Sequence, residues 1–244
     1  EGEINSGGDL KINGSSVGLY ADLEAAGSLS GNNTSVGVGW LGITSNGSIQ
    51  DAIDIASNSG AAITVQPGLY EEVLAIADTK TNLELVGANR STTIIQGTED
   101  NMVWWNDWPL ANPNIEILGD GTEIHEFTIR GPDPKTGYYS SGIVIGGDNV
   151  EIYNNNIEVT NASTLEDISQ GIQTYRNGNA GAGDLDGLNI HHNDFSAHGT
   201  GTAGYEGIFI NHVGSGTTPV GRVTINANTF SGQVVRAITT ERSK

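Results

Sequence analysis

A single unit of sequence occurs three times between residues 142 and 232. Each copy holds a short run similar to Gly-Ile-x-Ile, followed by a longer β-branched run with an asparagine two positions before a bulky apolar residue. The copies are residues 142–157, 171–195 and 207–230, and a fourth begins at Ala237. Alternate residues of each run are apolar, so we expect strands with one buried side. One such unit cannot bury its apolar side alone, which predicts that the copies stack into a solenoid.

Asparagines occupy equivalent positions in the three copies, at Asn155, Asn193 and Asn228. Asparagine tolerates the left-handed backbone conformation of a sharp bend. Its side-chain amide can also bond to the same group one coil away. The pattern therefore predicts a ladder of stacked asparagines at one corner of the solenoid.

The repeated unit is similar to the coils of the right-handed parallel β-helix proteins of the pectin-lyase-like superfamily. Residues 48–53 and 63–72 resemble the opening of that fold, and the likeness covers residues 43–244. The resemblance implies an all-β chain: a single-stranded right-handed parallel β-helix with a short N-terminal capping α-helix. It implies little about activity, because the superfamily includes lyases, hydrolases, esterases, tailspikes, adhesins and surface proteins.

Two regions follow from these patterns. Residues 1–42 are rich in Gly, Ser and Asn and form an extension, which is either a pair of edge strands or a flexible arm. Residues 43–244 form the β-helix domain of seven or eight coils. Its helix begins after Ser48 and ends at Gly60, with apolar residues at helical spacing between them.

The charge balance limits the partners of this chain. The net charge is −19 with only ten Lys and Arg residues, which argues against binding to nucleic acid or to an anionic membrane. A polyanionic polysaccharide would need bound calcium to supply positive charge. The sequence begins at Glu1, contains no cysteine and has no apolar run of membrane-spanning length. These features predict an extracellular or cell-surface protein after removal of a signal peptide.

Sequons for N-glycosylation are frequent, although a chain rich in Asn, Ser and Thr contains some by chance. The predicted glycosylation sites are Asn13, Asn33, Asn46, Asn89 and Asn161.

Three of the four tryptophans lie within five residues, at Trp104, Trp105 and Trp108. Tryptophan faces stack on sugar rings and anchor protein interfaces, and a loop can also pack them against the solenoid. The cluster is therefore a candidate for carbohydrate or interface contact, beside the alternative of simple packing.

A groove is predicted along the Gly-Ile-x-Ile strands. Their outward positions are Val144, Gln173, Phe209 and Thr239, and inserts at residues 177–187 and 213–222 would form a wall beside them. The predicted contact residues of this groove are Gln173, Tyr175, Phe209, Asn211 and His212.

Candidate chemistry is sparse. Histidines and carboxylates gather in the sequence at His191, His192, Asp194, His198, Glu206 and His212. The strand register places His191 outward and His192 inward, so separate surface or corner positions are favoured over one site. Asp184 and Asp186 lie in a Gly-rich loop and are the candidate calcium ligands; the alternative is no cofactor.

The catalytic patterns of pectin methylesterases, pectate lyases and polygalacturonases are not recognisable, so no catalytic residue is assigned. The last coil also lacks a cap, which leaves an adhesive edge. We therefore expect a non-catalytic structural or cell-surface protein that associates with itself or docks into a cell-envelope or extracellular assembly. The alternatives are a polysaccharide lyase or glycoside hydrolase, and a carbohydrate-binding adhesin that uses the groove.

Overall fold

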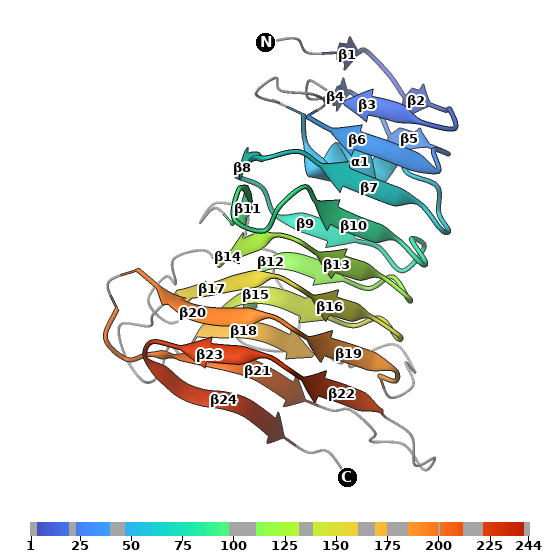
Figure 1. The fold of residues 1–244 in the computed structure, drawn as a ribbon. Coiled ribbons are helices and arrows are strands. Elements are labelled where there is room, and N and C mark those ends of the chain that lie inside the picture. The colour runs from blue at the N-terminus through green and yellow to red at the C-terminus, as the bar shows by residue number, and fades with distance from the viewer. Residues whose placement is uncertain are drawn as a thin grey trace.

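The structure is a computed structural model, and it describes residues 4–19, 23–39, 47–97, 111–131, 139–160, 169–174, 185–199, 201–211 and 222–241. Its strands form a stack of windings that runs from the N-terminal end to the C-terminal end (Figure 1). All strand pairings of the described residues are parallel, and each joins strands of successive windings. The predicted parallel β-helix is therefore confirmed.

The longest sheet, sheet I, has eight strands, one for each winding. From the last winding to the first they are β22 (Val223–Asn226), β19 (Leu188–His191), β16 (Glu151–Tyr153), β13 (Glu123–His125), β10 (Glu84–Gly87), β7 (Ala62–Val65), β6 (Ser35–Val38) and β3 (Val17–Leu19).

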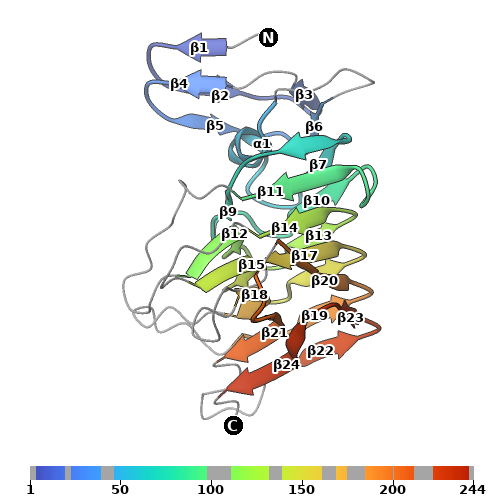
Figure 2. The same cartoon turned by 90° about the vertical axis from the view of Figure 1, so that its left-hand side faces the viewer.

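Two further sheets of six strands each complete the walls. Sheet II contains β23 (Thr229–Ser231), β20 (Asp194–His198), β17 (Asn156–Thr160), β14 (Thr128–Arg130), β11 (Thr93–Gln96) and β8 (Gly68–Tyr70). Sheet III contains β24 (Val234–Glu241), β21 (Tyr205–Asn211), β18 (Ser169–Thr174), β15 (Tyr139–Ile145), β12 (Ala111–Ile117) and β9 (Leu74–Ile76). Figure 2 shows the strands of sheet III along one side of the stack.

The segment 4–39 forms two additional windings. It contributes β3 and β6 to sheet I and two short pairs, β1 (Ile4–Ser6) with β4 (Leu23–Ala25) and β2 (Leu10–Ile12) with β5 (Leu29–Gly31). Because β6 pairs with β7 from Ser35 to Val38, these windings continue the solenoid without a break in register. The sequence left open whether residues 1–42 form edge strands or a flexible arm. The described residues of this segment form strands.

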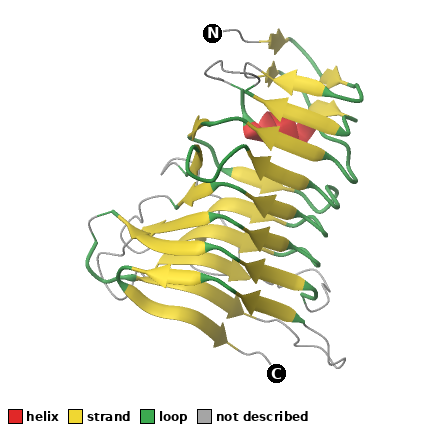
Figure 3. Ribbon diagram, in the orientation of Figure 1, coloured by secondary structure: helices red, strands yellow, loops and turns green. Residues whose placement is uncertain are grey.

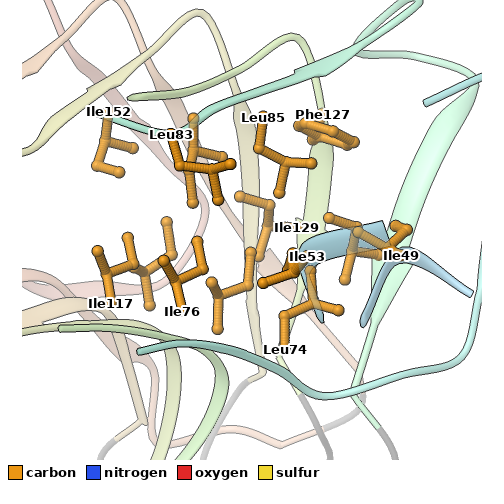
Figure 4. Close-up of a cluster of buried hydrophobic side chains, with 14 of the residues drawn as sticks. Ile49, Ile53, Leu74, Ile76, Leu83, Leu85, Ile117, Phe127, Ile129 and Ile152 are labelled. Carbon is orange, nitrogen blue, oxygen red and sulfur yellow. The ribbon is translucent and has the colours of Figure 1, made fainter. Parts of the chain in front are cut away.

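The predicted helix is α1 (Ile49–Ile55), and Ser48 caps it by accepting the backbone N–H of Asp51. The expectation that this helix closes the N-terminal end is wrong. The windings formed by β1–β6 lie beyond it, so α1 occupies the place of a strand inside the stack (Figure 3). Its Ile49 and Ile53 enter the same interior cluster as Leu74 of β9 (Figure 4), which explains why a helix is accepted there.

The corner ladder is confirmed by its hydrogen bonds. The Oδ1 atom of Asn193 accepts the backbone N–H of Asn155 at 3.1 Å, and Oδ1 of Asn228 accepts that of Asn193 at 3.0 Å. The side-chain amides also donate to the next Oδ1 in the ladder, at 3.2 and 3.0 Å. The left-handed conformation, however, is adopted by the residue directly before the corner position in each coil. These residues are Glu126, Asn154, His192 and Ala227.

This corner also divides the longer run of each repeat. Residues 150–157, for example, contain the end of β16 and the start of β17, with Asn155 between them. Each coil therefore has three strands where the sequence pattern indicates two. Alternation of apolar residues does not reveal the turn, because the side chains on both sides of the corner still point into the interior.

Candidate functional site

The predicted groove lies along the outer face of sheet III. Only some of the residues predicted to line it are among the described residues. Val144, Gln173, Phe209 and Thr239 are in register on successive strands. Gln173, Phe209 and Thr239 are partly exposed, whereas Val144 is buried although it does not belong to the interior cluster. Asn211 ends β21, and its side chain lies outside the described part of the chain.

Several predicted contact residues fall outside the described residues. They are Tyr175, His212, Trp104, Trp105 and Trp108. Their roles in carbohydrate or interface contact stay predictions.

A buried polar network crosses the same face. Oε1 of Glu206 accepts a hydrogen bond from Nη1 of Arg236 at 2.7 Å, and Oε2 of Glu206 accepts one from Nε2 of Gln170 at 3.2 Å. The Glu206 side chain is only 4% exposed, whereas that of Arg236 is 58% exposed. The positive charge of Arg236 therefore offsets the free-energy cost of burying the charged carboxylate of Glu206. Ser141 extends the network by donating to Oε1 of Gln173 at 3.1 Å.

Gln170 and Arg236 were not predicted from the sequence as partners of Glu206. A signal was present, because a polar residue precedes the first position of every repeated unit, in the order Ser141, Gln170, Glu206 and Arg236. These four residues are in register on neighbouring strands. Comparing the repeats column by column would have placed them side by side.

The carboxylates of this face do not form a hydrolytic pair. Glu116 lies in β12 and Glu206 in β21, so two strands, β15 and β18, separate them. At about 4.8 Å per strand the two backbones are about 14 Å apart. Paired glycosidase carboxylates lie about 5–9.5 Å from each other. Burial raises the pKa of Glu116, but no second carboxylate stands opposite it among the described residues of this face.

The predicted group of histidines and carboxylates is brought together only in part. His191 faces outward from β19 as expected, with Nε2 2.7 Å from Oε1 of Glu151. The expectation that His192 faces inward is wrong, because strand alternation ends at the corner and His192 is exposed with φ of 56°. The two rings still touch, with 2.8 Å between their Nδ1 atoms.

The other members of the group take separate partners. Asp194 pairs with Arg90 at 3.0 Å, and Nδ1 of His198 lies 3.8 Å from Oε2 of Glu158. His212 is outside the described residues. Of the described members, His192 and Asp194 line one pocket of about 430 Å³, together with Arg90, Glu126, Asn154 and Ala227.

Rings stack along the outer face of sheet I. Tyr153 lies between His125 and His191, with ring centroids 4.4 and 5.2 Å apart and nearly parallel planes. Burial, together with the surrounding glutamates, raises the pKa of Tyr153 to about 12. His125 and His191 thus belong to a structural ladder of stacked rings, which the sequence pattern did not predict.

The predicted calcium ligand Asp186 has a structural role in the described chain. Its Oδ1 accepts the backbone N–H groups of Gly187 and Arg222, at 2.8 and 2.9 Å. It also continues a second corner ladder, in which Asp148 N donates to Asp120 and Asp186 N donates to Asp148. The described residues contain no group of three His, Asp or Glu side chains able to hold a metal ion. Asp184 lies outside them, so calcium binding there stays a prediction.

The aspartate ladder predicts a stability change with a defined pH dependence. Burial and the charges of Asp120 and Asp186 raise the pKa of Asp148, so its charged form is disfavoured in the fold. The stability that this group contributes is present below its unfolded pKa and is lost as the pH rises through the raised folded pKa. We expect Asp148→Asn to raise the melting temperature by about 1–2 °C at about pH 7, and to have no such effect at about pH 3.

Thermal unfolding followed by circular dichroism at both pH values measures this effect. Asp186→Asn is the matched control, because hydrogen bonds from Arg222 and Gly187 lower the pKa of Asp186 and its charged form is the favoured one. That variant should lose stability at about pH 7. A gain from both substitutions would contradict the ladder as the cause.

The predicted glycosylation sites differ in their environment. Asn13 and Asn89 are exposed, and Asn46 and Asn161 lie outside the described residues. Asn33 is buried, and its Nδ2 donates to the carbonyl oxygens of Ile12 and Ile55 at 2.8 and 2.6 Å. The prediction of a glycan on Asn33 is therefore wrong, because this amide joins neighbouring windings.

The last winding exposes apolar side chains that earlier windings bury. Ile143, Ile172 and Ile208 form one interior row and are fully buried, whereas the next residue of that row, Ile238, is 47% exposed. Val235 in the same strand is 39% exposed. No described strand pairs with the outer edge of β22, β23 or β24. The apolar surface and the open edges together form a candidate association surface.

Charge is distributed unevenly between the first and last segments of the sequence. Residues 1–39 contain five acidic residues and one basic residue, a net charge of −4. Residues 222–244 contain four basic residues and one acidic residue, a net charge of +3. Among the described residues the first segment has Asp9, Lys11 and Glu24, a net charge of −1, and the last has Arg222, Arg236 and Glu241, a net charge of +1.

Comparisons with known proteins add little beyond the fold. No protein-family model matches the sequence, and no curated protein matches it either. A solved structure with a similar fold is the pectin methylesterase from carrot, at 13% identity and a TM-score of 0.43, covering 87% of this chain and 89% of the other. At this identity and TM-score the likeness carries no argument about this chain. Among the described helices, none is long and apolar enough to span a membrane.

Proposed function

We propose that this chain is a non-catalytic structural protein that associates with itself through the exposed surface of its last winding. One observation carries the proposal: Ile238 is 47% exposed, although its three predecessors in the same interior row are fully buried. An apolar row interrupted in this way is stabilised when a further winding covers it. A second copy of the chain can supply that winding.

The polar network of sheet III supports a structural role over a catalytic one. Glu206 is almost fully covered and already bonded to Arg236 and Gln170, so it has little access to a substrate. Its distance from Glu116 is too large for a carboxylate pair. The histidines of sheet I stack with Tyr153 and do not converge.

An extracellular or cell-surface setting is part of the proposal. Asn13 and Asn89 lie in sequons and are exposed, which supports this setting. The strong negative charge keeps single copies soluble and apart until their complementary surfaces meet. Docking to a cell-envelope component would use the same last winding.

Carbohydrate binding is the second candidate function. Phe209 and Gln173 are partly exposed at paired positions on the outer face of sheet III, where the ring offers an apolar face and the amide offers hydrogen-bond donors and an acceptor to a sugar. Binding of a neutral oligosaccharide without formation of new reducing ends would favour this function over catalysis.

Sedimentation velocity over a range of protein concentrations tests self-association, with electron microscopy to show whether the products are regular. We expect the unmodified chain to form regular polymers, and Ile238→Asp to weaken their formation by about a hundredfold, because it removes apolar burial and introduces an unpaired charge. Leu69→Asp is the matched control, since Leu69 is 55% exposed in β8, away from the last winding. A chain that remains monomeric at every concentration would overturn the proposal, as would an equal effect of both variants.

A further inference from the structure

The pocket of about 430 Å³ lies at the corner between sheets I and II, away from the groove predicted on sheet III. Its volume falls in the range of small-molecule sites, about 300–1,000 Å³. The lining residues lie directly before the corner position of successive windings, or close to it. They are Arg90, Glu126, Asn154, His192, Asp194 and Ala227.

Four of these residues hold a backbone conformation that most side chains avoid. They have φ between 50° and 65°, in the left-handed region, and they are Glu126, Asn154, His192 and Ala227. Glycine and asparagine adopt this conformation most readily. At the corner between sheets III and I the left-handed residues of successive windings are of those two types, namely Asn82, Gly121, Asn149 and Gly187. Strain kept at one corner and avoided at the other indicates that Glu126 and His192 are present for their side chains.

Two polar side chains of the pocket have no partner among the residues that the structure describes. The carboxylate of Glu126 and the side-chain amide of Asn154 make no hydrogen bond or ion pair there, although both residues are half-buried. A partly covered polar group is stabilised when a ligand or water pairs with it. Glu126 therefore offers hydrogen-bond acceptors to the pocket, and Asn154 offers both donors and an acceptor.

Arg90 is fixed beside these groups by the turn between β10 and β11. Its carbonyl oxygen accepts hydrogen bonds from Oγ1 of Thr128 at 2.6 Å and from Nδ2 of Asn156 at 3.3 Å, which fastens the turn to the two following windings. Its Nη1 lies 3.0 Å from Oδ2 of Asp194. A guanidinium carries five N–H donors, so this ion pair leaves others for a ligand.

The hydrogen bonds of His192 define what its ring offers. Nε2 of His191 lies 2.7 Å from Oε1 of Glu151, and because a carboxylate only accepts, His191 donates there. When both rings are neutral, Nδ1 of His191 accepts the proton on Nδ1 of His192, 2.8 Å away. The Nε2 atom of His192 then keeps its lone pair and is a hydrogen-bond acceptor.

From the strained backbone, the unpaired polar groups and the fixed arginine we infer that this pocket binds a neutral saccharide unit. Each hydroxyl of a sugar donates and accepts, which matches donors on Arg90 and Asn154 beside acceptors on Glu126. The lining carries +1 from Arg90 and −2 from Glu126 and Asp194, a net charge of −1 that disfavours an anionic ligand. The inference does not depend on the proposed self-association, and it places the sugar on a different face from sheet III.

Titration of the isotope-labelled chain with single sugars, followed by NMR, tests the inference. The probes are glucose, galactose, mannose, xylose and N-acetylglucosamine. We expect at least one of them to shift the amide signals of Glu126, Asn154 and His192. The expected Kd is about 1–10 mM, as for a ligand of about twelve non-hydrogen atoms that each contribute modestly.

Substitution of Glu126 tests whether the pocket is responsible. Glu126→Gly should weaken binding about tenfold or more, because hydrogen bonds to a charged group are lost, and it should keep the fold, because glycine suits the left-handed backbone. Glu126→Gln keeps the size of the side chain and should weaken binding about threefold or more. Asn149→Gly is the matched control, since it makes the same kind of change at the corner between sheets III and I and should leave the Kd unchanged.

Four results would overturn the inference. The first is no binding of any of these sugars at about 50 mM. The second is shifts confined to Gln173 and Phe209, which would place the sugar on sheet III. The third is inorganic phosphate shifting the same three signals, which would identify an anion site around Arg90. The fourth is an equal Kd for Glu126→Gly and Asn149→Gly. Self-association is measured separately by sedimentation, so none of these results decides it.

Discussion

Replacing Asn193 by alanine is expected to lower the free energy of unfolding by about 3–4 kcal/mol, which corresponds to a fall in melting temperature of roughly 10 °C. Asn193 is fully buried, and its Nδ2 donates to the carbonyl of Ile152 at 2.9 Å while its Oδ1 accepts the N–H of Asn155. Alanine makes neither bond and leaves the backbone N–H of Asn155 without its acceptor inside the protein, where an unpaired group costs about 1–3 kcal/mol. Denaturant or thermal unfolding measures the loss.

The control for this prediction is the same change at the end of the ladder. Asn228 makes equivalent bonds to Ile190 and Asn193 but is only partly buried. Water can replace part of what Asn228→Ala removes, so its effect should be less than half as large. Equal losses at the two positions would show that burial does not set the strength of the ladder.

Replacing Gly171 by valine is expected to destabilise the fold by about 3 kcal/mol or more. A Cβ atom on Gly171 would lie 2.7 Å from the carbonyl oxygen of Gly207 and 2.8 Å from the ring of Phe195. Phe195 itself stacks on Phe230, with centroids 4.8 Å apart, so it has little room to move. Gly171→Ala should show a smaller loss of the same sign, about 1–3 kcal/mol.

Gly8→Ala provides the matched control for the glycine series. A methyl group there would meet no atom within 4 Å, and the residue is exposed. Its melting temperature should stay within about 1 °C of the unmodified chain. If Gly171→Val unfolds at the same temperature as Gly8→Ala, the close approach between windings is not what selects glycine at the start of each repeat.

The fold was predictable because its signals are local and repeated. The apolar alternation, the corner asparagines and the cap of Ser48 each act over a few residues, and all three are confirmed. The windings formed by residues 4–39 were left undecided because their strands are short and rich in glycine. Because those windings were not predicted, α1 was expected to close the N-terminal end of the stack and not to lie inside it.

The candidate sites were less predictable than the fold. Whether Glu206 is free or bonded to Arg236 depends on which strand lies next to it, and the repeats reveal this only when they are aligned column by column. His192 was misplaced because a corner residue leaves the alternation of the strand. Asn33 satisfied a glycosylation sequon, but no short motif reports that its side chain joins two windings.

The sequence by itself determined that the chain is a stack of β-windings, since periodic apolar residues must find a neighbouring unit to cover them. It also carries the unequal charges of the two ends, which any folded form would inherit. Only the tertiary structure decided which polar groups are paired and which apolar residues remain uncovered, because pairing and exposure depend on contacts between residues 30 to 40 positions apart. Burial of Asn193 and exposure of Ile238 are properties of neighbouring windings and not of the residues themselves.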